Sequence, residues 1–214
     1  MKYIQNKVRS EQGGLHSLPA VFHVADLTLR LGWSSKVALQ RLHHWMLVGQ
    51  VQRLSSTTDV YANLSASKYP NWEPALRMIM PSTVVMGIEA LRRAGWITQI
   101  PYLSTVAVDA AERVFDVERF SVLALPTEWF RQMAPGIQGG EAGSLKCVKP
   151  AWALADLIKR EGWCDCGVGP DDIYWDDVTQ QDEEDWATAR VTLGLAEHSM
   201  NPDAGISDIA HSAT

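Results

Sequence analysis

The stretch FHVADLTLRLGWSSKVALQRLHHWMLVGQVQRLSSTTDVYANL, residues 22–64, holds the strongest pattern in the chain. Its first part predicts a short helix with apolar residues at Val24, Leu27 and Leu31, closed by a glycine-tryptophan turn. A longer helix follows and ends at Gly49, and VQRL, SSTTD and VYANL then predict a β-hairpin. Two helices at a tight turn followed by a hairpin predict a winged helix-turn-helix, a device that places its second helix in the DNA major groove.

The second helix has two chemically different faces. Ser34 or Ser35 is a suitable N-cap, because a hydroxyl accepts from the exposed amides of the first turn. At ~100° per residue, the predicted buried face carries Leu39 at its edge and, at its centre, Ala38, Leu42, Trp45 and Met46. The opposite face is polar, with Arg41 at the boundary and Lys36, Gln40, His43 and His44 outward.

The polar face carries donors that suit DNA. Lys36 and Arg41 suit phosphate or guanine, and Gln40 suits adenine. The predicted DNA-binding residues are Ser34, Ser35, Lys36, Gln40, Arg41, His43 and His44 on the helix and Arg53 on the wing. An ordinary amphipathic helix with a solvated polar face is the alternative, and the turn before the helix and the hairpin after it favour DNA.

Charge is divided unequally along the 214 residues, whose net charge is −6. Residues 1–68 hold eight Lys or Arg and three Asp or Glu, which gives +5. The remainder holds 11 basic and 22 acidic residues, which gives −11. A basic module can therefore bind phosphate locally although the whole chain is acidic, and the acidic part should avoid DNA.

The predicted fold class is α+β, with three segments. Residues 1–68 form the winged helix-turn-helix domain, residues 69–200 a mixed α/β domain, and residues 201–214 a flexible tail. A proline-containing linker starts at Ser65. In the second domain we expect helices capped near Ser82, after Lys149 and from residue 181, with a mixed or antiparallel sheet that includes a hairpin over 113–125.

Several functional classes find no support. The chain has no Gly-rich phosphate loop, no G-x-S-x-G and no H-E-x-x-H, so nothing indicates an enzyme or a cofactor. Its three cysteines are too few and badly spaced for structural zinc, so no metal site is predicted. No apolar run is long enough for a membrane span, and a cytoplasmic location follows. The acidic cluster Asp171, Asp172, Asp176 and Asp177 is expected to be a solvated turn, with cation binding left open.

Three stretches resemble the AbiEi-type antitoxins of type IV toxin–antitoxin systems. ADLTLRLGWSSKVALQRLHHWMLVGQVQRL…VYANL is similar to their winged helix, STVVMGIEALRRAGWITQIP to the helix and strand after the linker, and KPAWALADLIKR to a late Ala-rich helix with an Asp. Together they cover most of residues 24–160. The wing turn SSTTD departs from the Arg-Gly often found there.

The resemblance implies a separate function for each domain. The first domain would bind operator DNA and repress its own operon. The second would counteract a nucleotidyltransferase-like toxin, with direct contact between the two proteins left open. The family is associated with mobile elements and phage defence, and a homodimer on palindromic DNA remains open.

Two other hypotheses belong to different classes. In the first, the winged helix is a protein-interaction adaptor, or a transcription regulator of a mobile element without antitoxin activity, because fold does not fix function. Leu47, which projects on the polar side of the helix, favours the adaptor. In the second, the acidic cluster near Asp171 holds a metal for an enzyme.

Overall fold

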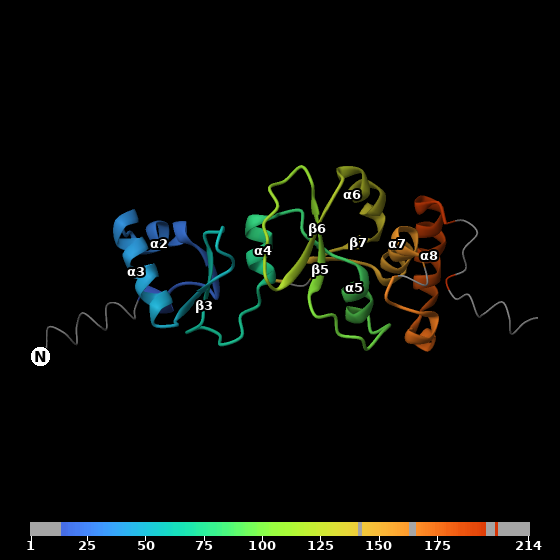
Figure 1. Cartoon of the computed structure of the whole chain (residues 1–214), viewed down its shortest axis with the longest axis horizontal. Helices are drawn as coiled ribbons and strands as arrows, with labels where there is room; N and C mark the ends of the chain where they lie inside the picture. Colours follow the sequence, from blue (N-terminus) through green and yellow to red (C-terminus); the bar gives the residue numbers. More distant parts are fainter. Residues whose placement is uncertain (1–13, 141–142, 163–165, 196–199, 201–214) are drawn as a thin grey trace, which may run out of the picture. The chain divides into compact units, whose positions relative to one another are not determined.

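The computed structural model describes residues 14–140, 143–162, 166–195 and 200. Its architecture is α+β, with two sheets and several helices (Figure 1), so the predicted class is confirmed. The chain divides into two compact units, Met1–Pro81 with Phe115–Glu118, and Ser82–Val114 with Arg119–Thr214. The predicted tail, 201–214, lies outside the described residues.

The first unit combines a helix pair with a three-stranded antiparallel sheet. Its elements are β1 (Val21–His23), α2 (Val24–Leu31), α3 (Ser35–Leu47), β2 (Val51–Arg53), β3 (Val60–Asn63) and α4 (Glu73–Ile79). The strand order is β1-β3-β2, so the hairpin β2–β3 gains a third strand from the segment before α2. Its core contains Phe22, Leu27, Leu42 and Trp45, each at most 3% exposed.

Two sequence predictions for this unit were wrong in detail. The helix was predicted from Phe22, but Phe22 and His23 belong to β1. The His23 imidazole accepts from Ala25 N and Asp26 accepts from His23 N, so His23 is the N-cap and the helix begins two residues later, at Val24. The linker after Ser65 contains α4, which packs against β1 and β3. The first unit therefore continues beyond the predicted boundary at residue 68.

The second unit is built on a five-stranded mixed sheet of order β6-β5-β4-β8-β7. Its strands are β4 (Val84–Val85), β5 (Ser104–Asp109), β6 (Phe120–Leu125), β7 (Ile137–Gln138) and β8 (Lys146–Val148). Its helices are α5 (Gly87–Arg93), α6 (Thr127–Met133), α7 (Pro150–Glu161) and α8 (Gln180–Leu193), with short 3₁₀ turns at Ala134–Gly136, Pro170–Asp172 and Trp175–Asp177.

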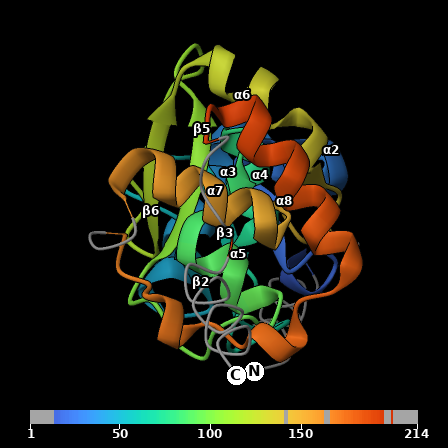
Figure 2. The same cartoon turned by 90° about the vertical axis from the view of Figure 1, so that its right-hand side faces the viewer.

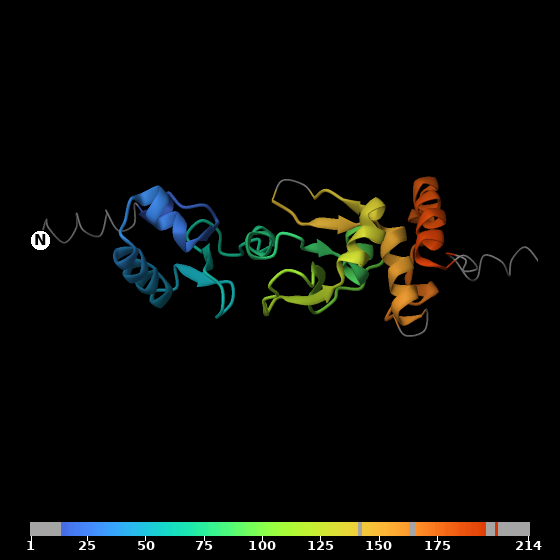
Figure 3. The ribbon, with the colours of Figure 1, turned by 90° about the horizontal axis from the view of Figure 1, so that it is seen from above.

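The predicted helix after Lys149 is confirmed as α7, and its small residues explain its position. The eight residues Ala151–Ile158 are all buried, because α5 and α8 pack on α7 and leave it no solvated side within this stretch. Figure 2 shows α7 and α8 in front of the sheet, and Figure 3 shows α7 (orange) between the sheet and α8 (red). The buried Asp156 is satisfied at 2.8 Å by Trp129 Nε1 and at 2.9 Å by Arg160 Nε.

Two other predictions for the second unit were wrong. Val84 and Val85 form a strand, and the helix begins only at Gly87. The expected hairpin over 113–125 contains the single strand β6, which runs parallel to β5. Alternation of apolar residues predicts a strand but not its direction, so the pattern could not distinguish an antiparallel hairpin from a single strand that pairs in parallel with β5. Among the described residues, no helix has the length and apolarity needed to span a membrane.

Candidate nucleic-acid interface

Helix α3 is the element on which the predicted DNA-binding residues converge. Ser34 caps it, with Oγ accepting from Val37 N at 3.5 Å, and Gly49 follows its end with a left-handed φ of 71°. The buried residues of α3 are Ala38, Leu42 and Trp45, three of the four that were predicted at the centre of this face. The Trp45 ring lies 5.7 Å from that of Trp33, so packing at the turn between the helices fixes which face of α3 points outward.

The outward face is the polar one. Ser35, Lys36, Gln40, His43 and His44 are all exposed. The thirteen residues Ser35–Leu47 include no acidic side chain, and the positive end of the helix dipole lies at their beginning. This surface can therefore offer hydrogen-bond donors to an anion without a competing carboxylate on the same helix.

Two apolar residues on α3 are more exposed than the sequence predicts. Met46 was predicted on the buried face but is 39% exposed, and Leu39, predicted at the edge, is 57% exposed. Leu47, which was predicted on the polar side, is 72% exposed. These side chains are exposed because α3 contacts the core through a narrow strip, in which only Ala38, Leu42 and Trp45 are buried. Arg41 is half-buried at the boundary, as its angular position predicts.

Arg53 is held within its own hairpin. Its Nε donates to the Thr58 carbonyl, and its terminal nitrogen lies 2.9 Å from Asp59 Oδ1. Its guanidinium also sits 5.7 Å from the centre of the Tyr61 ring. Burial raises the pKa of Tyr61, and the nearby Arg53 opposes this effect only in part. Arg53 therefore braces the hairpin, and Asp59 offsets the charge that it was expected to offer to DNA.

Sequence reasoning missed the contribution of His23, which joins β1 to α2 by capping the helix. The signal was present, because Asp26 stands three residues after His23, the spacing of a capping box. Histidine is not among the preferred N-cap residues, so the pattern was not recognised. Leu39 was also left out of the predicted site, because an apolar residue at a helix edge is normally assigned to the core.

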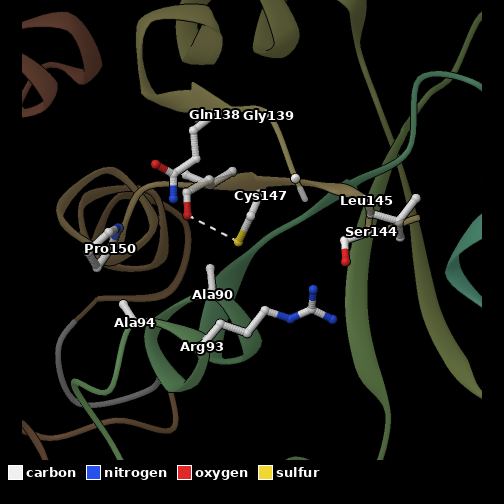
Figure 4. A pocket seen from close by; sticks show the side chains of 11 residues that line it. Ala90, Arg93, Ala94, Gln138, Gly139, Ser144, Leu145, Cys147 and Pro150 are labelled. Atoms are coloured by element: carbon white, nitrogen blue, oxygen red, sulfur yellow. Dashed lines mark hydrogen bonds between the residues drawn. The ribbon is translucent and has the colours of Figure 1, made fainter. Parts of the chain in front are cut away.

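A separate cavity of about 310 Å³ lies in the second unit (Figure 4). It lies beside α5 and β8, and its lining comprises Ala90, Arg93, Ala94, Gln138, Gly139, Gly140, Ser144, Leu145, Cys147, Val148 and Pro150. Arg93 Nε donates to the buried Glu89 at 2.7 Å, and the Cys147 thiol donates to the Val148 carbonyl at 3.4 Å.

The acidic cluster lies in two separate 3₁₀ turns. Asp171 and Asp172 belong to the first turn, and Asp176 and Asp177 belong to the second. Asp172 accepts from the Gly169 amide at 2.8 Å, an ordinary turn contact. In the part of the chain that the structure describes, no three His, Cys, Asp or Glu side chains gather in a way that could hold a metal ion.

Comparisons with known proteins identify the fold alone. No family model and no curated protein matches the chain. Among solved structures, it is similar to the crystal structure of the RV2827C protein from Mycobacterium tuberculosis, with 17% identity and a TM-score of 0.58. The match covers 94% of this chain and 80% of the other. The chain thus shares its overall architecture with that protein.

Proposed function

We propose that this protein is a winged-helix DNA-binding repressor that acts as the antitoxin of a type IV toxin–antitoxin system. The observation that carries the DNA-binding half is the outward face of α3, which exposes the polar side chains of Lys36, Gln40 and His43 and has no acidic side chain. The order helix, turn, helix and hairpin matches a fold that presents its second helix to the major groove. We assign recognition to α3, with Lys36, Gln40 and His43 facing the DNA.

The antitoxin half rests on the sequence resemblance. STVVMGIEALRRAGWITQIP and KPAWALADLIKR lie in the second unit, where they supply β4, α5 and α7. These elements carry much of that unit's core, so the resemblance concerns the scaffold of the proposed antitoxin domain. The second unit is acidic and is therefore repelled by DNA, so the first unit is the one that binds the operator.

Binding of the full chain to duplex DNA from upstream of its own reading frame tests the repressor half. We expect fluorescence anisotropy to give an affinity that falls steeply with salt, since phosphate contacts release counterions. Lys36→Ala should weaken binding and lower the salt slope by about one unit, the value for one lost phosphate contact. Lys159→Ala removes another exposed lysine, from α7 in the second unit, and should change neither quantity. Salt-independent or absent binding would overturn the DNA-binding proposal.

Co-expression tests the antitoxin half. We expect a nucleotidyltransferase-like toxin in the neighbouring reading frame to arrest growth and the full chain to restore it. Lys36→Ala should restore growth as well as the wild type does, because toxin neutralisation belongs to the second unit. Continued arrest in the presence of the folded protein would contradict the antitoxin assignment.

One observation favours a second candidate, the protein-interaction adaptor. Leu47 and Val48 at the end of α3 are 72% and 53% exposed, and Leu29 on α2 is 81% exposed. Exposed apolar side chains of this kind suit a protein partner better than phosphate. An adaptor would show no affinity for the upstream duplex, so the anisotropy experiment distinguishes the two functions.

A further inference from the structure

Leu39 stands among the polar side chains on the outward face of α3. It is 57% exposed, whereas Leu42 on the same helix is 3% exposed. Lys36 lies three residues before Leu39 and His43 four after it, and Gln40 lies four after Lys36 and three before His43. Helix positions three or four apart are neighbours, with Cβ atoms about 5–6 Å apart. Lys36, Leu39, Gln40 and His43 therefore form one continuous exposed surface, here called the α3 patch.

The α3 patch combines an amide with an aliphatic group, and this pair matches one base pair in particular. A glutamine amide can bond to both N6 and N7 of adenine in the major groove. Thymine is the base that presents a methyl group there, and an apolar side chain recognises it by contact. A single exposed leucine is ordinary on a protein surface. Leu39, however, borders hydrogen-bond donors on a helix without a carboxylate.

We propose that the α3 patch reads an A·T base pair in the major groove. Gln40 pairs with the adenine, and Leu39 contacts the 5-methyl group of a thymine in the same or the adjacent pair. Lys36 and His43 hold the neighbouring phosphates or guanine. This inference rests on the proposed DNA-binding function and adds to it the identity of the base pair and the residue that reads the methyl group.

The test begins with selection of duplexes from a randomised pool by the full chain. The enriched duplex is then synthesised with deoxyuridine in place of one thymine at a time, which removes only the methyl group. At one position we expect the wild-type protein to bind about fourfold more weakly, which corresponds to about 0.8 kcal/mol for one buried carbon. Replacing the adenine by 7-deazaadenine removes the N7 acceptor and should weaken binding at least about fivefold.

Variants assign each effect to its residue. Leu39→Ala should bind the thymine and uracil duplexes equally and keep the wild-type salt slope, because it removes a methyl contact and no phosphate contact. Gln40→Ala should become insensitive to 7-deazaadenine. Leu47→Ala is the matched control, since it removes another exposed leucine from α3, and it should retain full sensitivity to uracil.

The outcomes separate this inference from the proposed function. Salt-dependent DNA binding with no position sensitive to uracil would refute the thymine contact and leave the repressor function standing. Equal uracil sensitivity in wild type and Leu39→Ala would also refute it. Absence of any salt-dependent binding would refute both.

Discussion

Replacing Glu89 by Gln should destabilise the second unit through a specific electrostatic defect. Glu89 lies on α5 and is 3% exposed. Its carboxylate accepts from Arg92 Nε and a terminal Arg92 nitrogen, both at 2.8 Å, and from Arg93 Nε at 2.7 Å. A glutamine keeps one acceptor oxygen but turns an NH₂ group toward these donors, so at least one guanidinium contact becomes donor against donor.

The size of the stability loss can be estimated from the burial of the two partners, because Glu89 is buried and its arginine partners are partly exposed. Removing one partner of a fully buried pair costs about 3–5 kcal/mol. The side chains of Arg92 and Arg93 are 37% and 27% exposed, so water replaces part of what they lose. We therefore expect a loss of about 2 kcal/mol, or a fall in Tm of about 8 °C for a unit of this size.

The loss should depend on pH in a definite direction. Burial, the largest single influence, raises the pKa of Glu89, but the hydrogen bonds and charges of Arg92 and Arg93 together outweigh it and lower the pKa below its usual 4.5. A lowered folded-state pKa contributes stability above the unfolded value, and that contribution is lost as pH falls through the folded value. The difference between wild type and Glu89→Gln should be full at pH 7 and shrink below about pH 4.5.

Scanning calorimetry at several pH values is the appropriate assay, because it resolves separate transitions if the two units unfold independently. Glu128→Gln serves as the control. Glu128 is 55% exposed and pairs with the 72% exposed Arg131, so its removal should cost less than about 1 kcal/mol. Equal losses in the two variants, or a Glu89→Gln loss that persists unchanged to pH 3, would refute the reasoning.

Three further substitutions should lower stability in chemical denaturation. Asn63→Ala should cost about 1–3 kcal/mol, because the buried amide that donates to the backbone carbonyls of Leu15 and Leu18 is lost; an unchanged midpoint would contradict this. Gly136→Ala should destabilise by about 1–3 kcal/mol, since its Cβ would lie 2.3 Å from Trp152 Cγ, and a neutral result would mean that the ring can move. Thr179→Ala removes the N-cap of α8 and should cost about 1 kcal/mol, with loss of helical circular dichroism at the transition as the readout.

Local patterns predicted those elements whose signals lie within a few residues. A capping hydroxyl at Ser34 or Ser35, a terminal glycine at residue 49 and most of the core positions of α3 can be found in the sequence, and the structure has Ser34 as the cap, Gly49 after the helix and Ala38, Leu42 and Trp45 in the core. The helix α7 was equally predictable, with Pro150 in its first turn and apolar residues at helical spacing. In these elements, local propensity and burial agree.

Features that depend on distant partners were not predictable from the sequence. β1 exists because Val21–His23 pair with Val60–Ala62, nearly forty residues away, and β4 is a two-residue strand between β5 and β8. The exposure of Leu39 depends on how far the core reaches around α3, which the helical period alone does not determine. The engagement of Arg53 by Thr58 and Asp59 likewise depends on the exact register of the hairpin.

The first unit is built from two stretches of chain that are not consecutive in the sequence, and this has a consequence for truncated forms of the protein. A fragment that ends at Pro81 would lack Phe115–Glu118. That segment contains Val117, which is 1% exposed, and Phe115, whose amide lies 3.5 Å from Met80 Sδ. An isolated amino-terminal fragment would therefore lack residues that pack in its own unit. Limited proteolysis should yield a nicked but associated molecule more readily than an autonomous amino-terminal domain.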